Sequence, residues 1–348
     1  MKTRHTNEIS ELFTREVVEQ PDRLDALAEQ YAKDPTVLER TRDTVRSCRG
    51  SVYLVGMGNS ESSARTALWT FTKNNISTAV REGGEFLHYG LADLRPDDLV
   101  VFISVSGLSA EIVGLNNALP STVRRILITN NPDSPMAKST PYVLPMHTGE
   151  EQTTASKTYM NTVALMELLA VPSLRDGLQS IRHLAGEVRK AQSRLETERD
   201  AVAEFVGHPD TPLEILGRGP GFGVANYGSL ILRELYQTKV LYFPAGTYRH
   251  GPILDAGAGN RIIIISQGKT RDLSDALARE LAELGETVLL IRDGIGPAPS
   301  AKNLKVIECP TENEDHFKFL AGLVLANLAI AWTFFRPVKF VRRITTNE

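Results

Sequence analysis

Short, mostly apolar runs recur along the chain, and three of them occur twice in the same order. The two sets occupy residues 51–56, 99–104 and 124–129, and residues 213–217, 261–266 and 286–291. The copies are evenly spaced, since the glycines that end the first pair lie 217 − 56 = 161 residues apart and the serines that end the second pair lie 266 − 104 = 162 apart. A continuous apolar run of this length is typical of a strand buried on both faces of a parallel sheet. The repeat therefore predicts two similar sheets built by duplication.

Stretches with helical periodicity lie between these runs. They are predicted over residues 61–74, 110–118, 226–237 and 274–284. Because strand and helix alternate, each copy is expected to be α/β, a doubly wound parallel sheet with helices on both faces. A charged amphipathic segment at residues 179–205 predicts a helix that joins the copies. The expected division is an N-terminal helical arm (1–46), a first domain (47–190), a second domain (200–335) and a C-terminal tail (336–348).

One long apolar stretch, residues 317–335, has two interpretations. Its length is that of a membrane-spanning helix. However, Asn327 lies in its middle and no second span follows it in the sequence. We therefore expect a helix buried in the second domain and no association with a membrane.

Composition narrows the class of protein. The chain has 348 residues, enough for two domains, and its 42% hydrophobic and 23% charged residues are typical of a globular protein. A formal charge of −3 with scattered basic residues argues against nucleic acid as a partner. Two distant cysteines, Cys48 and Cys309, and a polar N-terminus without the apolar core of a signal peptide predict a cytoplasmic protein without disulfides.

Candidate chemistry gathers where the first two apolar runs end. GMGNSES follows the first run and SVSGLSA the second, and each leads into a predicted helix. Doubly wound sheets bind ligands at the carboxyl ends of their strands, and a helix N-terminus supplies free N–H groups and a positive dipole end. Together with the serine hydroxyls, these groups favour a phosphate site that needs no lysine. For the second loop alone, an ordinary helix cap with Ser109 as the capping residue is the alternative. The first loop lacks the third glycine and the acidic partner of a dinucleotide-binding fingerprint.

A set of short motifs extends over nearly the whole chain. In order they are EVVEQPDRLDAL, VGMGNSESSA, FISVSGLSAEIV, TGEEQTTASKTY, LGRGPGF and LRELYQTKVLYFPAGTYRHGP. Their order and spacing resemble the sugar isomerase (SIS) domain family, in particular the isomerase half of glucosamine-6-phosphate synthase and its stand-alone relatives. Those relatives are amino-sugar-phosphate deaminases and isomerases and fructosamine-6-phosphate deglycases. The resemblance implies two tandem flavodoxin-like SIS domains, a small sugar-phosphate substrate and a homodimer with a shared active site.

The resemblance also implies which residues bind the sugar phosphate. They are Ser104, Ser106 and Ser109 of the second loop and Ser60 and Asn59 of the first, with Gly58 beside them in the pocket. The family often has glutamine between the first two serines, where this chain has Val105. One side-chain donor is therefore lost while the backbone amide remains, so weaker or differently oriented phosphate binding is expected.

Glu234 and His250 are the catalytic pair that the resemblance implies, since their separation of 250 − 234 = 16 residues is the family's spacing. A carboxylate can take a proton from one sugar carbon and return it to the next through an enediol or enaminol, best with a pKa raised by burial. A histidine can open the sugar ring by moving a proton, and in the family it commonly comes from the partner subunit. Without the resemblance, Glu234 could be a surface ion-pair residue and His250 an ordinary loop histidine.

Two positions depart from the synthase pattern. Ile231 stands where the synthase half has a lysine, and Arg343, in FVRRITTNE, stands where the family has the lysine that forms an imine with the ketose. Arginine stays protonated and cannot be that nucleophile. Lys339 is near in sequence, but its register does not favour the role. The N-terminus also lacks the Met-Cys start of a glutaminase, so glutamine-dependent synthesis is not expected.

A substrate that already carries an amine needs no imine with the enzyme. The sequence therefore favours a deglycase that releases an amine and a hexose 6-phosphate from a 1-amino-1-deoxyketose 6-phosphate. Glucosamine-6-phosphate deaminase and aldose–ketose isomerase remain alternatives, and a non-catalytic sugar-phosphate-binding regulator is the alternative of another class. Further pocket candidates are Glu151, Lys157, Arg218 and Arg343, although Arg218 could equally form an ion pair. Neither a cofactor nor a metal is expected, because the histidines lack metal-like spacing.

Overall fold

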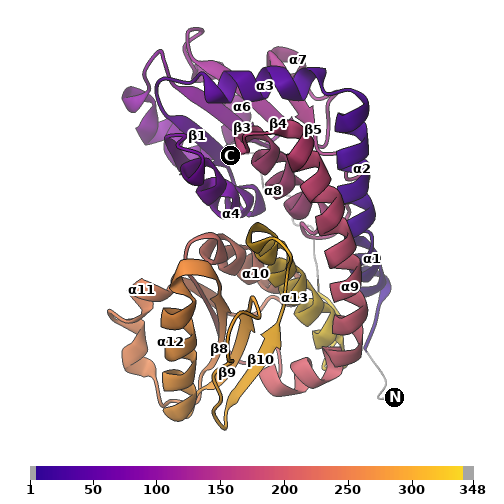
Figure 1. The fold of residues 1–348 in the computed structure, drawn as a ribbon, viewed down its shortest axis with the longest axis vertical. Helices are drawn as coiled ribbons and strands as arrows, with labels where there is room; N and C mark the ends of the chain where they lie inside the picture. The colour runs from indigo at the N-terminus through magenta and orange to yellow at the C-terminus, as the bar shows by residue number, and fades with distance from the viewer. Residues whose placement is uncertain (1–4, 340–348) are drawn as a thin grey trace. The chain divides into compact units, whose positions relative to one another are not determined.

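The chain folds into two compact units, each built around one parallel sheet (Figure 1). The structure is a computed structural model and describes residues 5–339. We call the part formed by Gln20–Glu151 and Ala155–Ala185 the first-sheet unit. The second-sheet unit consists of residues 5–19, Gln152–Thr154 and residues 186–339.

The first-sheet unit contains five strands and the helices that cover them. The strands are β1 (Val52–Gly56), β2 (Thr78–Glu82), β3 (Leu99–Ile103), β4 (Arg124–Thr129) and β5 (Tyr142–Pro145). The helices are α2 (Gln20–Lys33), α3 (Thr36–Arg46), α4 (Asn59–Lys73), α5 (Gly83–Glu85), η1 (Phe86–Gly90), η2 (Leu91–Asp93), α6 (Ala110–Ala118), α7 (Pro135–Ser139) and α8 (Lys157–Ala170). The 33-residue helix α9 (Leu174–Val206) begins in this unit and ends in the other.

The second-sheet unit repeats this architecture. Its strands are β6 (Leu213–Gly217), β7 (Val240–Pro244), β8 (Arg261–Ser266), β9 (Thr287–Arg292) and β10 (Leu304–Glu308). Its helices are α1 (Glu8–Val18), α10 (Pro220–Tyr236), α11 (Ala245–Tyr248), η3 (Pro252–Asp255), η4 (Gly268–Thr270), α12 (Arg271–Glu283), η5 (Glu314–His316), α13 (Phe317–Ala331) and η6 (Trp332–Phe334).

Strand order confirms both the duplication and the flavodoxin-like fold. The sheets have the orders β2-β1-β3-β4-β5 and β10-β9-β8-β6-β7, and every pairing is parallel. When the strands of the second sheet are numbered 1 to 5 within their own copy, their order is 5-4-3-1-2. Read from the other side this is 2-1-3-4-5, the same order as in the first sheet and the order of flavodoxin. Three of the six predicted central strands, β1, β3 and β8, are buried at every position, and β4, β6 and β9 are mostly buried.

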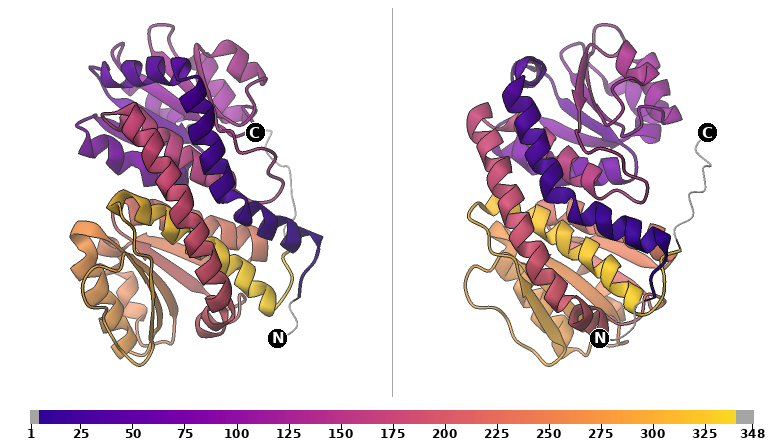
Figure 2. Two further views of the ribbon diagram at one scale, coloured as in Figure 1. Left: turned by 45° about the vertical axis from the view of Figure 1, so that its right-hand side comes forward. Right: turned by 90° about the vertical axis from the view of Figure 1, so that its right-hand side faces the viewer.

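The N-terminal helices do not form one arm. Three helices are present where helices were predicted, but α1 belongs to the second-sheet unit while α2 and α3 belong to the first. Helix α1 packs beside α13, as Figure 2 shows. The alternation of buried Phe13 and Val17 with exposed positions explains how α1 covers an apolar neighbour.

The apolar stretch near the C-terminus is a core helix. Residues Glu314–Phe334 are long and apolar enough to span a membrane, yet 94% of the most apolar window is buried within the protein. Helix α13 packs against α10 on one side of the second sheet. The interpretation of residues 317–335 as a buried helix is confirmed.

One predicted helix begins earlier than expected. Helix α10 starts at Pro220, six residues before the predicted Asn226, because proline is suited to the first helical turn and the glycines of GPGFG continue the helix. Gly221 is required by packing, since a Cβ there would lie 2.9 Å from Cγ2 of Ile265. The glycine-rich segment therefore is not a loop, and the missing side chain at Gly221 lets α10 pack closely against β8.

Candidate active site

The two hydroxyl-rich loops lie side by side at the point where the strand order of the first sheet reverses. Strands β1 and β3 pair directly, with Val55 opposite Phe102, so the loops that follow them leave the same edge of the sheet. In doubly wound sheets this switch point is where ligands bind. The predicted phosphate-binding residues of the two loops are therefore brought together.

The loop between β3 and α6 keeps its hydroxyl protons available. Ser104 Oγ accepts a hydrogen bond from the backbone N–H of Gly107 (3.2 Å), and Ser106 Oγ accepts one from the N–H of Leu108 (3.2 Å). Each hydroxyl thus stabilises the turn as an acceptor and can still donate its own proton. Ser109 occupies the N-cap position of α6, but its side chain makes no capping hydrogen bond. The alternative of an ordinary Ser109 cap is not what the structure shows.

The loop between β1 and α4 also leaves donors and acceptors unused. Gly58 is the N-cap residue of α4 and so cannot cap the helix with a side chain. Oδ1 of Asn59 is buried and has no hydrogen-bond partner. Because a side-chain amide can be turned by 180°, its NH₂ group can take that position and donate to an anion. Ser60, also partly buried, follows in the first turn of α4.

Two asparagines that the sequence did not single out hold the second loop in place. They follow β4 directly, and the Asn131 side-chain amide donates to the Ser106 carbonyl oxygen (3.1 Å). The Asn130 amide donates to the Gly149 carbonyl oxygen (2.7 Å), and its N–H bonds to the carbonyl of Val105. These contacts fix the loop with neutral groups and bring no negative charge to it.

The equivalent loop of the second copy is occupied by the protein's own carboxylate. Asp293, which follows β9, accepts a hydrogen bond from the Gly268 N–H (3.1 Å) and two from the Arg271 guanidinium (2.7 and 2.6 Å). Burial disfavours the charge of Asp293, but the hydrogen bonds from Arg271, Gly268 and Ile295 outweigh it and lower the pKa of this carboxyl. An internal carboxylate therefore binds at this loop in the second copy, whereas neutral asparagine side chains hold the loop of the first copy.

Glu151 and Lys157 both have local structural roles. The Glu151 carboxylate accepts from the backbone N–H groups of Ser156 (2.9 Å), Lys157 (2.7 Å) and Thr158 (3.3 Å) and from two hydroxyls, so it caps the N-terminus of α8. The buried Lys157 ammonium donates to the Glu150 carbonyl oxygen (2.7 Å). A part for either side chain in substrate binding stays a prediction.

Glu234 lies near the C-terminal end of α10, and its side chain is exposed in the single chain. The sequence led us to expect a buried carboxylate here, but within one chain Glu234 is exposed to solvent. Instead its Oε2 accepts a hydrogen bond from the hydroxyl of Thr154, a residue that is itself buried. Thr154 was not predicted; the only signal in the sequence is the hydroxyl-rich run TTAS between the glutamates and Lys157.

Glu234 and His250 lie at opposite ends of the strands of the second sheet. Strand β7 begins four residues after the end of α10 and runs parallel to β6. Glu234 therefore precedes the amino end of β7, whereas the exposed His250 follows its carboxyl end, beyond α11. The strand alone separates them by roughly 16 Å, from five residues at about 3.3 Å each. Within one chain the two residues therefore start from opposite ends of β7.

Of the remaining candidates, the structure describes Arg218 and Lys339. Arg218 follows β6 and lies against Gly246, and its Nε is buried without a partner. Lys339 is held near Glu234, since its N–H donates to the Leu235 carbonyl oxygen (2.8 Å) and its carbonyl accepts from Gln237 (3.0 Å). Arg343 lies outside the described residues.

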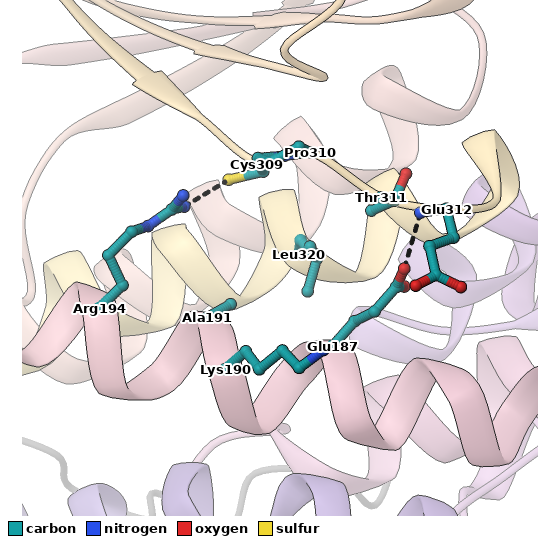
Figure 3. A pocket seen from close by; sticks show the side chains of 9 residues that line it. All are labelled: Glu187, Lys190, Ala191, Arg194, Cys309, Pro310, Thr311, Glu312 and Leu320. Atoms are coloured by element: carbon teal, nitrogen blue, oxygen red, sulfur yellow. Dashed lines mark hydrogen bonds between the residues drawn. The ribbon is translucent and has the colours of Figure 1, made fainter.

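A cavity of about 430 Å³ lies away from these residues, beside α9 in the second-sheet unit (Figure 3). Cys309 lines it and contacts Arg194 (3.7 Å), but burial raises the pKa of the thiol to about 12, so it is not a nucleophile at neutral pH. Glu187 accepts from the Glu312 N–H (2.8 Å) across the same cavity. Among residues 5–339, no group of three or more His, Cys, Asp or Glu side chains is placed to hold a metal ion.

Comparison with known proteins identifies the fold and the substrate class of its relatives. Residues 46–172 match the family model of the SIS domain. The chain is 27% identical over 342 residues to the glutamine–fructose-6-phosphate aminotransferase (isomerizing) of Pyrobaculum aerophilum. The aligned region covers 90% of this chain and 53% of that protein. Other curated relatives with the same name are matched over 43% and 40% of their length. This chain thus spans about half of these relatives or less.

Solved structures share the architecture of the whole chain. Tagatose-6-phosphate ketose/aldose isomerase from Escherichia coli superposes with a TM-score of 0.79 at 18% identity, covering 96% of this chain and 95% of that one. Glucosamine-6-phosphate deaminase from Thermotoga maritima gives a TM-score of 0.72 at 23% identity, covering 91% and 92%. At such identities the likeness establishes the fold alone.

Proposed function

We propose that this protein, whose residues 46–172 match the SIS domain family model, is an enzyme that moves a proton between C1 and C2 of a ketosamine or amino-sugar 6-phosphate. The favoured reaction is that of a fructosamine-6-phosphate-type deglycase. The observation that carries the proposal is the hydroxyl-lined loop pair after β1 and β3, whereas the second-copy counterpart of the loop after β3 binds Asp293. A phosphate group can accept hydrogen bonds from serine hydroxyls and from the N–H groups at a helix N-terminus.

In the proposed reaction the phosphate is held by Ser104, Ser106 and Ser109 with Ser60 and Asn59. His250 moves a proton from the anomeric hydroxyl to the ring oxygen, which opens the ring. The Glu234 carboxylate takes a proton from C1 of the 1-amino-1-deoxyketose, the C–H electron pair forms the C1=C2 double bond, and the C2 carbonyl oxygen takes a proton from solvent to give the 1,2-enaminol. Reprotonation at C2 gives an imine at C1. Water adds to C1, the C–N bond breaks, and an aldose 6-phosphate and a free amine leave.

The relatives' names support the substrate class, and the residues support the direction. One solved neighbour is named a glucosamine-6-phosphate deaminase and another a ketose/aldose isomerase, so carbonyl migration on a phosphosugar is the common chemistry of these names. Ile231 and Arg343 replace the two lysines of the synthase pattern. A substrate that brings its own amine makes an enzyme amine unnecessary, which favours deglycation over synthesis.

A substrate panel tests the proposal. Purified protein is incubated with fructosamine 6-phosphates of several amino acids, glucosamine 6-phosphate and fructose 6-phosphate, and release of amine, ammonia and each hexose 6-phosphate is followed. Glucose 6-phosphate with free amine in equal amounts supports a deglycase. Ammonia with fructose 6-phosphate would instead identify a deaminase. Binding of phosphosugars without any turnover would show a regulator and overturn the proposal.

A subunit-complementation experiment tests the shared site. Because Glu234 and His250 of one chain lie at opposite edges of a sheet, we propose that each active site of a homodimer takes one residue from each chain. Glu234→Gln and His250→Ala should each be inactive alone. In randomly mixed dimers half are hybrids with one intact site of two, so about a quarter of wild-type activity should return. A Glu234→Gln/His250→Ala double variant in place of either partner should restore nothing. Hybrids seen by native mass spectrometry but lacking activity would contradict a shared site.

A further inference from the structure

A buried carboxylate on the first helix holds the segment that contacts Glu234. Glu16 of α1 is only 2% exposed. It accepts a hydrogen bond from the Gln152 N–H (2.6 Å) through one oxygen and from the Thr153 hydroxyl through the other. Burying a charge is costly unless hydrogen bonds compensate, so these contacts fix residues 152 and 153 firmly against α1.

The next residue completes a chain of contacts to Glu234. Residues Gln152–Thr154 are the only ones between positions 20 and 185 that group with the second-sheet unit. They have neither helical nor strand structure, so their place is set by side-chain contacts. Thr154 is 3% exposed, and its hydroxyl donates to Oε2 of Glu234. Glu16 and Glu234 thus hold adjacent parts of one three-residue segment.

We propose that Glu16 is a positioning residue that fixes Thr154, so that the Thr154 hydroxyl orients the Glu234 carboxylate and keeps it ionised. The inference rests on the proposed function of Glu234 as the base. A hydrogen bond from a buried donor narrows the orientations that a glutamate side chain adopts, and proton transfer from carbon needs one orientation. A hydroxyl that donates to a carboxylate favours its charged form, which is the form that accepts a proton.

Five variants test this contact chain. Thr154→Val keeps the shape and removes the hydroxyl, Thr154→Ser restores it, Glu16→Ala removes the clamp, and Glu16→Gln weakens it while keeping the volume. Glu11→Gln, at an exposed position on the same helix, is the control. In Thr154→Val the hydrogen-bond donor is lost, which should raise the pKa of the Glu234 carboxyl. The acid limb of the pH profile of kcat/KM should then move to higher pH by about one unit, so that kcat/KM at pH values below the limb falls about tenfold.

The pattern among variants separates positioning from general destabilisation. Thr154→Ser should restore the wild-type limb, Glu11→Gln should not move it, and KM well above the limb should change less than about twofold. If Glu16 acts only through Thr154, the Glu16→Ala/Thr154→Val double variant should equal Thr154→Val alone. Effects that multiply, or a limb that stays in place in Thr154→Val, would overturn the proposal. Should Glu16→Ala not fold, Glu16→Gln should give a smaller shift of the same sign.

A direct titration keeps this inference separate from the proposed function. The Glu234 carboxyl is followed by NMR in protein with ¹³C-labelled glutamate, its signal assigned by its loss in Glu234→Gln. The titration midpoint should rise in Thr154→Val and in Glu16→Gln. A rise without turnover of any panel substrate would leave the contact chain standing and refute the enzyme proposal. An unchanged midpoint would refute the contact chain whatever the enzyme does.

Discussion

Replacing Glu234 with glutamine should lower kcat by about 10²- to 10⁴-fold while leaving phosphosugar binding intact, since a general base contributes on that order. Glutamine has the shape of glutamate and its carbonyl oxygen still accepts from Thr154, so the geometry of the end of α10 is kept. What is lost is the ability to take a proton from carbon. In D₂O, wild-type protein should exchange the substrate hydrogen at C1 with solvent, and the variant should not.

Arg233→Gln is the matched control for this experiment. Arg233 is exposed and immediately precedes Glu234 on α10. Arg233 has no role in the proposed reaction, so its replacement should change kcat less than about twofold. Because exposed substitutions of this kind are nearly neutral for stability, the fold should also be kept. Both variants should melt within a degree or two of the wild type. Deuterium exchange that continues in Glu234→Gln within tenfold of the wild-type rate would exclude Glu234 as the base.

The duplication made the fold predictable from the sequence. The three strands at the centre of each sheet are buried on both faces, so they appear as continuous apolar runs at a fixed offset. Strands at or near the edges have mixed burial and no such run, as in β2 and β10. For this reason the sequence predicted the central strands of each sheet, while the outer strands and the strand order became evident only in the folded chain.

The site was only half predictable, because its decisive contacts join distant positions. The serine loops are local features, and each can be recognised from a few consecutive residues. The contact of Thr154 with Glu234 spans 80 positions, and that of Glu16 with Gln152 spans 136. Nothing in the local pattern encodes such pairs. Likewise, both loops follow equivalent apolar runs, and only the folded chain shows that Asp293 binds at the second.

The placement of Glu234 also corrects an assumption of the sequence analysis. Ligand-binding residues were expected at the carboxyl ends of strands, where the loops after β1 and β3 lie. Glu234 instead lies at the end of α10, on the side where β7 begins. A helix after a strand returns the chain to the opposite edge of the sheet, so a residue at its end cannot share an edge with the loop at its start.

Replacing Gly107 with alanine should disable the phosphate loop. Gly107 has a φ of +65°, and a Cβ there would lie 2.2 Å from Oγ of Ser134 and 2.7 Å from its Cβ. Strain and overlap together should cost about 2–4 kcal/mol and lower Tm by roughly 5–10 °C. The turn in which the Gly107 N–H bonds to Ser104 would shift, and KM for the phosphosugar should rise about 10- to 100-fold. Calorimetry and initial rates measure both effects.

The corresponding glycine of the second copy separates strain from ligand binding. Gly268 has a φ of +55°, but a Cβ there would meet no atom within 4 Å. Gly268→Ala should therefore cost only about 1 kcal/mol of backbone strain. Its loop already binds Asp293 and holds no substrate in our proposal, so KM should be unchanged. If both alanine variants raised KM equally, the two loops would be functionally alike and the assignment of phosphate to the first copy would fail. If neither did, the phosphate would be bound elsewhere.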